Sequence, residues 1–166
     1  RGLGDVYKRQ ILGKVDAQLH YFNEDVPKSV YQKFIGYAPA VLVVPEELGI
    51  TTLEEAAKLP FIMLEIIGWK EKEQLVKRAM ESHGMVINRI AALDNVSSVL
   101  KLIKQKSAAT VLLEYQAPID GYKFIRVPEH FYPDGWPKVV VQVKQSLRHD
   151  AMHQLLIGAI AKYMSA

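Results

Sequence analysis

The sequence predicts an α/β fold in which strands and helices alternate along the chain. Continuous β-branched runs such as AVLVVP, at Ala40–Pro45, suit strands that are buried on both faces. Amphipathic stretches with apolar residues at helical spacing separate these runs. Strands that alternate with helices of about ten residues favour βαβ units and a parallel sheet.

The individual elements follow from the same patterns. The expected strands are, in chain order, residues 15–22, 40–45, 61–64, 85–93, 109–114, 122–128 and 138–144. The first expected helix lies within the string ITTLEEAAKLP, residues 50–60. Three further helices are expected at residues 70–82, 94–106 and 149–164. In a chain of 166 residues these elements suit one compact unit or two small lobes.

Polar residues and glycines mark the expected helix ends. Thr52 and Glu55 form a capping box at the start of the first helix. Gly84 follows the second helix as a C-terminal cap, and Asp94 or Asn95 caps the third. The last helix is expected to be amphipathic, with one face formed by Leu155, Leu156, Ala159, Ile160 and Tyr163.

Composition excludes several classes of site. The chain has no cysteine, which removes disulfides, thiolate nucleophiles and cysteine-based zinc sites. The sequence contains no nucleophile elbow or phosphate-binding glycine loop, and no apolar run reaches the ~18 residues of a membrane span. We therefore expect a cytoplasmic protein that is not an enzyme and has no cofactor, no metal site and no membrane partner.

The opening residues RGLGDVYKRQ, Arg1–Gln10, are expected to be foreign to the protein. Back-translated, they resemble the end of a transposase-type sequencing adapter, and such scars are set aside in fold prediction. A genuine basic N-terminal arm is the alternative. The block carries three cations and one carboxylate, so the net charge of +3 falls to about +1 without it and gives no support to nucleic-acid binding.

Several strings, taken in order, resemble one protein family. They are LGKVDAQL, YAPAVLVVPEE, TTLEEAAKLPFIMLE, AMESHGMVINRI, NVSSVLKLIKQKSAATVLLE and KVVVQVKQ, followed by the last helix. The series is similar to the C-terminal effector-binding (substrate-binding) domain of LysR-type transcriptional regulators. The resemblance extends from Ile11 to about Met164 and rests on the whole series, because no single motif is diagnostic.

The resemblance implies a two-lobed, periplasmic-binding-protein-like fold of type 2, with a small effector in the cleft between the lobes. Residues 11–45 and 144–166 would form an incomplete lobe I, and residues 46–143 would form lobe II. The family's winged helix-turn-helix would lie upstream of Ile11, so DNA would be bound only through that missing part. Homo-oligomers assembled by lobe-to-lobe contacts are expected from the same resemblance.

The chain departs from the family pattern after its third expected helix. The family has Gly-x-Gly before the next strand, whereas this chain has Lys106, Ser107 and Ala108. Leu113 stands where the family has a proline at the end of that strand. Glycine supports a positive φ at a helix end, so this turn must be built differently.

Three segments are candidate effector contacts. The first follows the expected strand 61–64 and consists of Glu65, Ile66, Ile67, Gly68 and Trp69. Sheets of this class bind ligands at the carboxyl ends of their strands, and an aromatic beside a glycine suits a pocket wall. The alternative is an exposed loop with Trp69 packed against the next helix.

The other two segments also have alternative interpretations. A helix start consists of Asn95, Val96 and Ser97. Its N–H groups and hydroxyls suit a carboxylate or phosphate, unless they only cap the helix. The third segment is the strand end Leu19, His20 and Tyr21. The resemblance implies that it lies on the lobe I wall of the cleft. His20 is alternatively a core or edge histidine with a satisfied hydrogen bond.

A pair of histidines on the last expected helix has the spacing of a zinc-binding motif. His149 and His153 lie one helical turn apart, on one face of that helix. Asp150 replaces the glutamate of that motif, and no third ligand is evident. A solvated helix start is therefore favoured over a metal site.

Two classes of function remain open from the sequence. The first is the effector-sensing domain of a LysR-type DNA-binding regulator, in which a small molecule, an anion among the candidates, shifts a conformational equilibrium. The second is a solute-binding protein of a transport system, which would share the two-lobed fold. The string-by-string resemblance favours the regulator.

Overall fold

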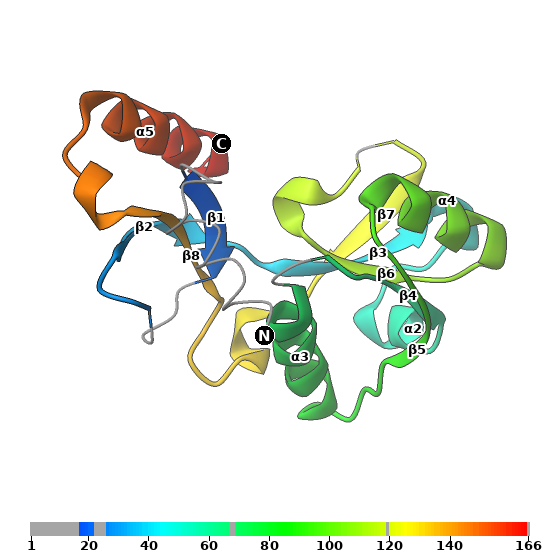
Figure 1. Cartoon of the computed structure of the whole chain (residues 1–166). Coiled ribbons are helices and arrows are strands. Elements are labelled where there is room, and N and C mark those ends of the chain that lie inside the picture. The colour runs from blue at the N-terminus through cyan, green and yellow to red at the C-terminus, as the bar shows by residue number, and fades with distance from the viewer. Residues whose placement is uncertain (1–16, 22–25, 67–68, 119, 166) are drawn as a thin grey trace. The chain divides into compact units, whose positions relative to one another are not determined.

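The computed structural model describes residues 17–21, 26–66, 69–118 and 120–165 (Figure 1). The suspected adapter block, Arg1–Gln10, lies outside the described residues. The chain divides into two compact units. Unit 1 consists of the residues up to Ala38 together with those from Pro137 onward, and unit 2 is Pro39–Trp136.

Unit 1 contains a three-stranded antiparallel sheet with a helix packed on it. Strand β8 lies in the centre, between β1 and β2. Ile157 and Ile160 of helix α5 pack against Val141 and Val143 of β8. The elements are β1 (Ala17–Tyr21), β2 (Val30–Tyr37), β8 (Lys138–Lys144), the 3-10 helix η4 (Gln145–Leu147) and α5 (Ala151–Ser165).

Unit 2 holds two groups of strands that hydrogen bonds join together. Strand β3 lies between β6 and β7 and is antiparallel to both, whereas β4 and β5 form a parallel pair. The Ile62 N–H donates to the Ala109 carbonyl at 2.9 Å, which joins β4 to the start of β6. The strands are β3 (Ala40–Pro45), β4 (Pro60–Leu64), β5 (Asn88–Leu93), β6 (Thr110–Leu113) and β7 (Tyr122–Arg126).

Helices cover both faces of β3 in unit 2 (Figure 1). One face carries a core cluster to which α2 and α3 contribute Ala56, Val76 and Met80. Helix α4 packs on the other side through Val99 and Ile103. All residues of β3 are buried, as the sequence predicted. The helices are α2 (Leu53–Ala57), α3 (Trp69–Glu81) and α4 (Val96–Lys106), with 3-10 helices η1 (Glu46–Leu48), η2 (Glu114–Gln116) and η3 (Glu129–Phe131).

The predicted parallel sheet is present only in part. Helix α3 connects β4 and β5 as a parallel βαβ unit. Strands β3 and β8 instead run antiparallel to their neighbours. Each of these two strands begins just after the chain passes from one unit to the other, at Ala38 and at Trp136. A strand that enters its sheet from outside the unit is not constrained by a βαβ crossover.

The pairing of β3 and β8 also sets the division of the chain. β3 pairs with strands of unit 2, and β8 pairs with strands of unit 1, so the division falls before each strand. The sequence placed the lobe boundaries at the far ends of the same strands, after Pro45 and before Lys144. Which unit corresponds to lobe I and which to lobe II stays a prediction.

Of the predicted apolar face of α5, Ile160 packs against β8, whereas Leu155 and Leu156 do not contribute to the core. Leu155 is 70% exposed and Leu156 is 43% exposed, whereas Ile157 is 1% exposed. Apolar residues occur on more than one side of this helix, so their spacing does not select the side that packs. Contact with the β8 valines selects it, and Ile157 is the residue that they cover.

The turn that lacks the family's glycines is closed by a serine in the left-handed conformation. Ser107 ends α4 at φ 50° and ψ 47°, and its N–H donates to the Ile103 carbonyl. The Ala108 N–H donates to the same carbonyl at 2.9 Å. A left-handed conformation costs a residue with a Cβ about 1–2 kcal/mol, so this turn carries local strain.

Candidate functional site

Two of the three predicted segments meet at one edge of unit 2. The last residues of the parallel strands β4 and β5, Leu64 and Leu93, are paired. The Glu65 N–H donates to the Leu93 carbonyl at 2.8 Å, so the chain leaves both strands side by side. Helices α3 and α4 begin just beyond, at Trp69 and Val96. Carboxyl strand ends combined with helix N-termini form the edge at which such sheets bind ligands.

The start of α4 is capped by Asn95. Its Oδ1 accepts the Ser98 N–H at 2.8 Å, which settles the choice between Asp94 and Asn95 as the cap. Its Nδ2 donates to the Asp94 carboxylate at 3.1 Å. Ser97 is exposed and Val96 is half-buried. The Asn95 side chain is therefore occupied by capping, and the exposed Ser97 hydroxyl is the accessible polar group of this turn.

Glu65 belongs to an ion-pair network that the sequence did not predict. Arg89 on β5 places Nη2 2.9 Å from Glu65 Oε2 and Nη1 3.1 Å from Glu73 Oε2 on α3. The one available signal was a cation within the apolar string MVINRIAAL. Ile66 is 41% exposed, and Ile67 and Gly68 lie outside the described residues. Arg89 therefore ties the loop after β4 to β5 and α3.

Trp69 is packed, as the alternative interpretation of this segment proposed. It is 3% exposed, and Lys72 Nζ lies 5.2 Å from the centre of its ring. Its indole N–H has no hydrogen-bond partner in the part of the chain that the structure describes. Burial lowers the pKa of Lys72 to about 8, and the neighbouring Glu71 opposes that change. A buried N–H donor and a partly desolvated cation are groups that an anion would stabilise.

The third predicted segment belongs to unit 1. Strand β1 carries Leu19, His20 and Tyr21, which pair in register with Val141, Val140 and Val139 of β8. The structure therefore places residues 65–66, Trp69 and residues 95–97 after the paired ends of β4 and β5 in unit 2, while residues 19–21 are part of the other unit.

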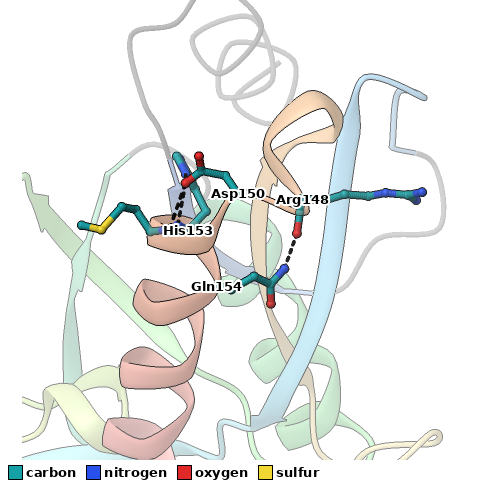
Figure 2. A network of polar contacts seen from close by, with 5 residues as sticks. Arg148, Asp150, His153 and Gln154 are labelled. Atoms are coloured by element: carbon teal, nitrogen blue, oxygen red, sulfur yellow. Dashed lines mark hydrogen bonds and ion pairs between the residues drawn. The ribbon is translucent and has the colours of Figure 1, made fainter.

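The two histidines make local hydrogen bonds, and Figure 2 shows that of His153 with Asp150. His149 lies in the turn before α5 and not on the helix, so the predicted helical spacing of the pair is wrong. Asp150 Oδ1 accepts the N–H groups of Met152 and His153 at 3.0 and 3.1 Å, and it lies 3.0 Å from His153 Nδ1. The hydrogen bond from the His153 side chain is the main cause that lowers the pKa of Asp150. His149 Nε2 accepts from Arg148 Nε at 3.0 Å. Among the described residues no group of three or more side chains could hold a metal ion.

The arrangement of strands and helices is similar to that of known bacterial regulators. The regulatory domain of MexT, a transcriptional activator in Pseudomonas aeruginosa, matches with a TM-score of 0.72 at 14% identity, over 95% of this chain and 77% of that chain. CbnR, a LysR family transcriptional regulator, matches with a TM-score of 0.69 at 9% identity, over 92% of this chain and 54% of CbnR. The chain has the fold of a LysR-type regulatory domain.

Further comparisons agree with the LysR-type regulatory-domain fold. The sulfate-bound regulatory domain of the OxyR2 E204G mutant from Vibrio vulnificus matches with a TM-score of 0.65 at 12% identity, over 96% of this chain and 77% of that chain. The predicted α/β class and periplasmic-binding-protein-like fold are confirmed. The chain spans about half the length of full-length CbnR. No family model and no curated protein matches the sequence. None of the described helices is long and apolar enough to cross a membrane.

Proposed function

We propose that the chain is the effector-sensing part of a cytoplasmic LysR-type transcriptional regulator and not an enzyme. One observation supports the proposal. Strands β4 and β5 end side by side, where Glu65 and Asn95 follow them, in a chain with the LysR regulatory-domain fold. Open α/β sheets bind their ligands at this edge, whatever the identity of the ligand.

The groups at this edge favour a small molecule with an anionic group. The first turns of α3 and α4 direct the positive ends of their dipoles to it, and Ser97 adds an exposed hydroxyl. The Trp69 indole N–H and the Lys72 ammonium are further donors beside the start of α3. With a pKa of about 8, Lys72 still carries its charge at neutral pH.

Signal transmission would require the ligand to contact both units. Leu19, His20 and Tyr21 on β1 are the proposed contacts from unit 1. A ligand that binds one arrangement of the units more tightly than another shifts the population by its difference in affinity. DNA would be bound by a winged helix-turn-helix outside this chain, in a homo-oligomer. Full-length CbnR, solved in a complex with its target DNA, matches this chain over 57% of its length.

Thermal unfolding with a panel of small carboxylates and phosphate esters, at constant ionic strength, tests the proposed site. A true effector at 100 times its Kd should stabilise the chain by about 2.7 kcal/mol. Ser97→Ala and Trp69→Phe should weaken that stabilisation. Trp136→Phe is the matched control, because its indole N–H donates to the Val127 carbonyl at 3.3 Å, outside residues 65–69 and 95–97. Equal losses in both tryptophan variants would reject the site.

The solute-binding protein of a transport system remains the alternative function. The solved structures named above are transcription regulators or their regulatory domains. Sequencing the source DNA across Arg1–Gln10 separates the two functions. A reading frame that continues upstream into a helix-turn-helix supports the regulator, and one that begins with a signal peptide rejects it.

A further inference from the structure

Unit 1 has a pocket of its own at one end of its sheet. It is a hollow open to solvent with a volume of about 460 Å³, and its described lining residues are Lys28, Ser29, Lys144, Gln145 and Ser146. The turn before β2 forms one side, and the end of β8 with the start of η4 forms the other. Both segments lie at the blue and orange end of unit 1 in Figure 1. The volume lies within the usual range of small-molecule sites, about 300–1,000 Å³.

Backbone hydrogen bonds hold the two sides of this pocket in place. The Gln145 N–H donates to the Ser29 carbonyl at 2.7 Å, and Val30 pairs in register with Lys144. The Val30 N–H also donates to the Pro27 carbonyl at 3.0 Å, which closes the turn that carries Lys28. Lys144 therefore ends a paired strand, and the backbone hydrogen bonds hold the turn with Lys28 and Ser29 next to the start of η4.

The pocket is separate from the proposed effector site. β2 begins beside it at Val30 and ends at Tyr37, next to the boundary of unit 1. β8 begins next to the other boundary, at Lys138, and ends beside the pocket at Lys144. The pocket therefore lies at the end of the sheet that is opposite to both chain crossings into unit 2.

The lining side chains supply cations and neutral donors. Two lysines, two serines and one glutamine are the described lining residues, and none of these is a carboxylate. Most of the lining surface is apolar, and these side chains add two cations and three neutral donors to it. Two like charges around one cavity repel each other, and an anion between them removes that repulsion. Lysine binds phosphate as a point charge with three donors, and hydroxyls donate to the remaining oxygens.

We propose that this pocket of unit 1 binds a small dianion, of which a phosphate monoester is the type. A phosphate monoester carries a charge of about −1.5 to −2 at neutral pH, which matches Lys28 and Lys144. Its oxygen atoms accept from the Ser29 and Ser146 hydroxyls, and the rest of the cavity holds the organic part of the ligand. The site is a second ligand site, independent of the edge formed by β4 and β5.

Amide NMR of the full chain with inorganic phosphate as the probe tests the proposal. At constant ionic strength, the amide signals of Ser29, Gln145 and Ser146 should shift with phosphate and reach saturation, and they should not respond to chloride. Lys28→Gln with Lys144→Gln keeps the side-chain stems and should weaken phosphate binding about tenfold or more. Shifts spread over all exposed lysines, with no saturation at these three amides, would overturn the proposal.

A second pair of substitutions provides the charge-matched control. Lys33→Gln with Lys58→Gln removes the same charge from two exposed lysines that do not line the pocket, and it should leave phosphate binding unchanged. Equal weakening in both double variants would show general charge attraction and reject the site. Ser146→Asp places a carboxylate on an exposed pocket residue, so it should abolish the phosphate shifts even if the lysine variant unfolds. Unchanged binding in Ser146→Asp would also reject the proposal.

Discussion

Unit 1 and unit 2 bury their central strands in different ways. In unit 2, β3 has helices on both sides, and all its residues are buried. In unit 1, the central strand β8 has the less apolar sequence KVVVQVK and buries Gln142, whose Nε2 donates to Gln32 Oε1 at 2.9 Å. A central strand can therefore be buried without a continuous apolar run, provided that its polar side chain has a hydrogen-bond partner.

The helices of the two units differ in the same way. On α3, polar residues occupy the outward side, and the predicted residues Val76 and Ala79 are 2% exposed. On α5, Leu155 is exposed although it belongs to the apolar face predicted from the sequence. Amphipathic spacing identifies the packed side of a helix only where the opposite side is polar. Unit 2 meets this condition, and the last helix of unit 1 does not.

The largest expected effect tests which side of α5 packs. Ile157→Ala should lower the free energy of unfolding by about 2–5 kcal/mol, because it removes a fully buried side chain and leaves a cavity. Leu155→Ala should change it by less than about 0.5 kcal/mol, because that side chain is exposed. Urea unfolding followed by circular dichroism measures both. A larger loss in Leu155→Ala would restore the side predicted from the sequence.

The next prediction concerns the free energy that burial of the Lys72 charge costs unit 2. A change in the Lys72 pKa from 10.5 to about 8 corresponds to about 3 kcal/mol, at 1.36 kcal/mol per pKa unit. Between these two pH values the native state binds fewer protons than the unfolded state, so stability should rise with pH there. Lys72→Met should stabilise unit 2 by about 2–3 kcal/mol at pH 7, because it removes the buried charge and keeps contact with Trp69.

Urea unfolding of both proteins from pH 7 to pH 10.5 checks this prediction about Lys72. The free-energy difference between the wild type and Lys72→Met should shrink as the pH rises through this range. Lys77→Met, on an exposed lysine of the same helix, is the control and should show no such convergence. A constant difference across the range would mean that burial does not depress the Lys72 pKa.

Local signals in the sequence predicted most elements of both units. The buried run Ala40–Pro45 became β3 with the same bounds, and Gly84 adopts the expected positive φ of 76° after α3. These features depend on residues close together in the chain. The antiparallel course of β3 and β8 depends on where the chain crosses between units, which no local pattern records.

The candidate site shows the same difference between local features, which the sequence predicts, and long-range contacts, which it does not. The sequence pattern predicted a strand end before Glu65 and a helix start at Asn95, and both are present in the structure. Whether these segments bind a ligand stays a prediction. The link through Arg89 was missed, because its partners Glu73 and Glu65 are 16 and 24 residues away in the sequence. Long-range ion pairs leave no periodic signal, so only the folded chain shows which carboxylates an arginine contacts.

A smaller effect is expected at the strained turn of unit 2. Ser107→Gly should raise the free energy of unfolding by about 1 kcal/mol, because glycine adopts the left-handed conformation without the penalty of a Cβ. Ser98→Gly, inside α4, should lower it by about 0.5–1 kcal/mol, since glycine is unfavourable within a helix. Thermal unfolding of both variants is the measurement. Destabilisation by Ser107→Gly would show that the serine side chain has a role beyond the turn.

The smallest effect concerns the start of α5, where unit 1 relies on an exposed charge rather than on packing. Hydrogen bonds from His153 hold the pKa of Asp150 below its usual value of 3.8. Because the folded pKa is the lower one, this contribution to stability is present above about pH 4 and is lost as the pH falls through the folded pKa. The first turn of α5 should therefore fray in acid before the rest of the helix.

Asp150→Asn separates the cap from its charge. Asparagine caps a helix as well as aspartate does, so the helix start should persist at neutral pH, and its dependence on acid pH should disappear. Amide signals of Met152 and His153, followed from pH 6 to pH 2, report on this turn directly. Asp134→Asn, an exposed aspartate before β8, is the control and should keep the wild-type profile. If Asp150→Asn and the wild type frayed at the same pH, the titrating group would be another one, and unit 1 would not depend on this charge.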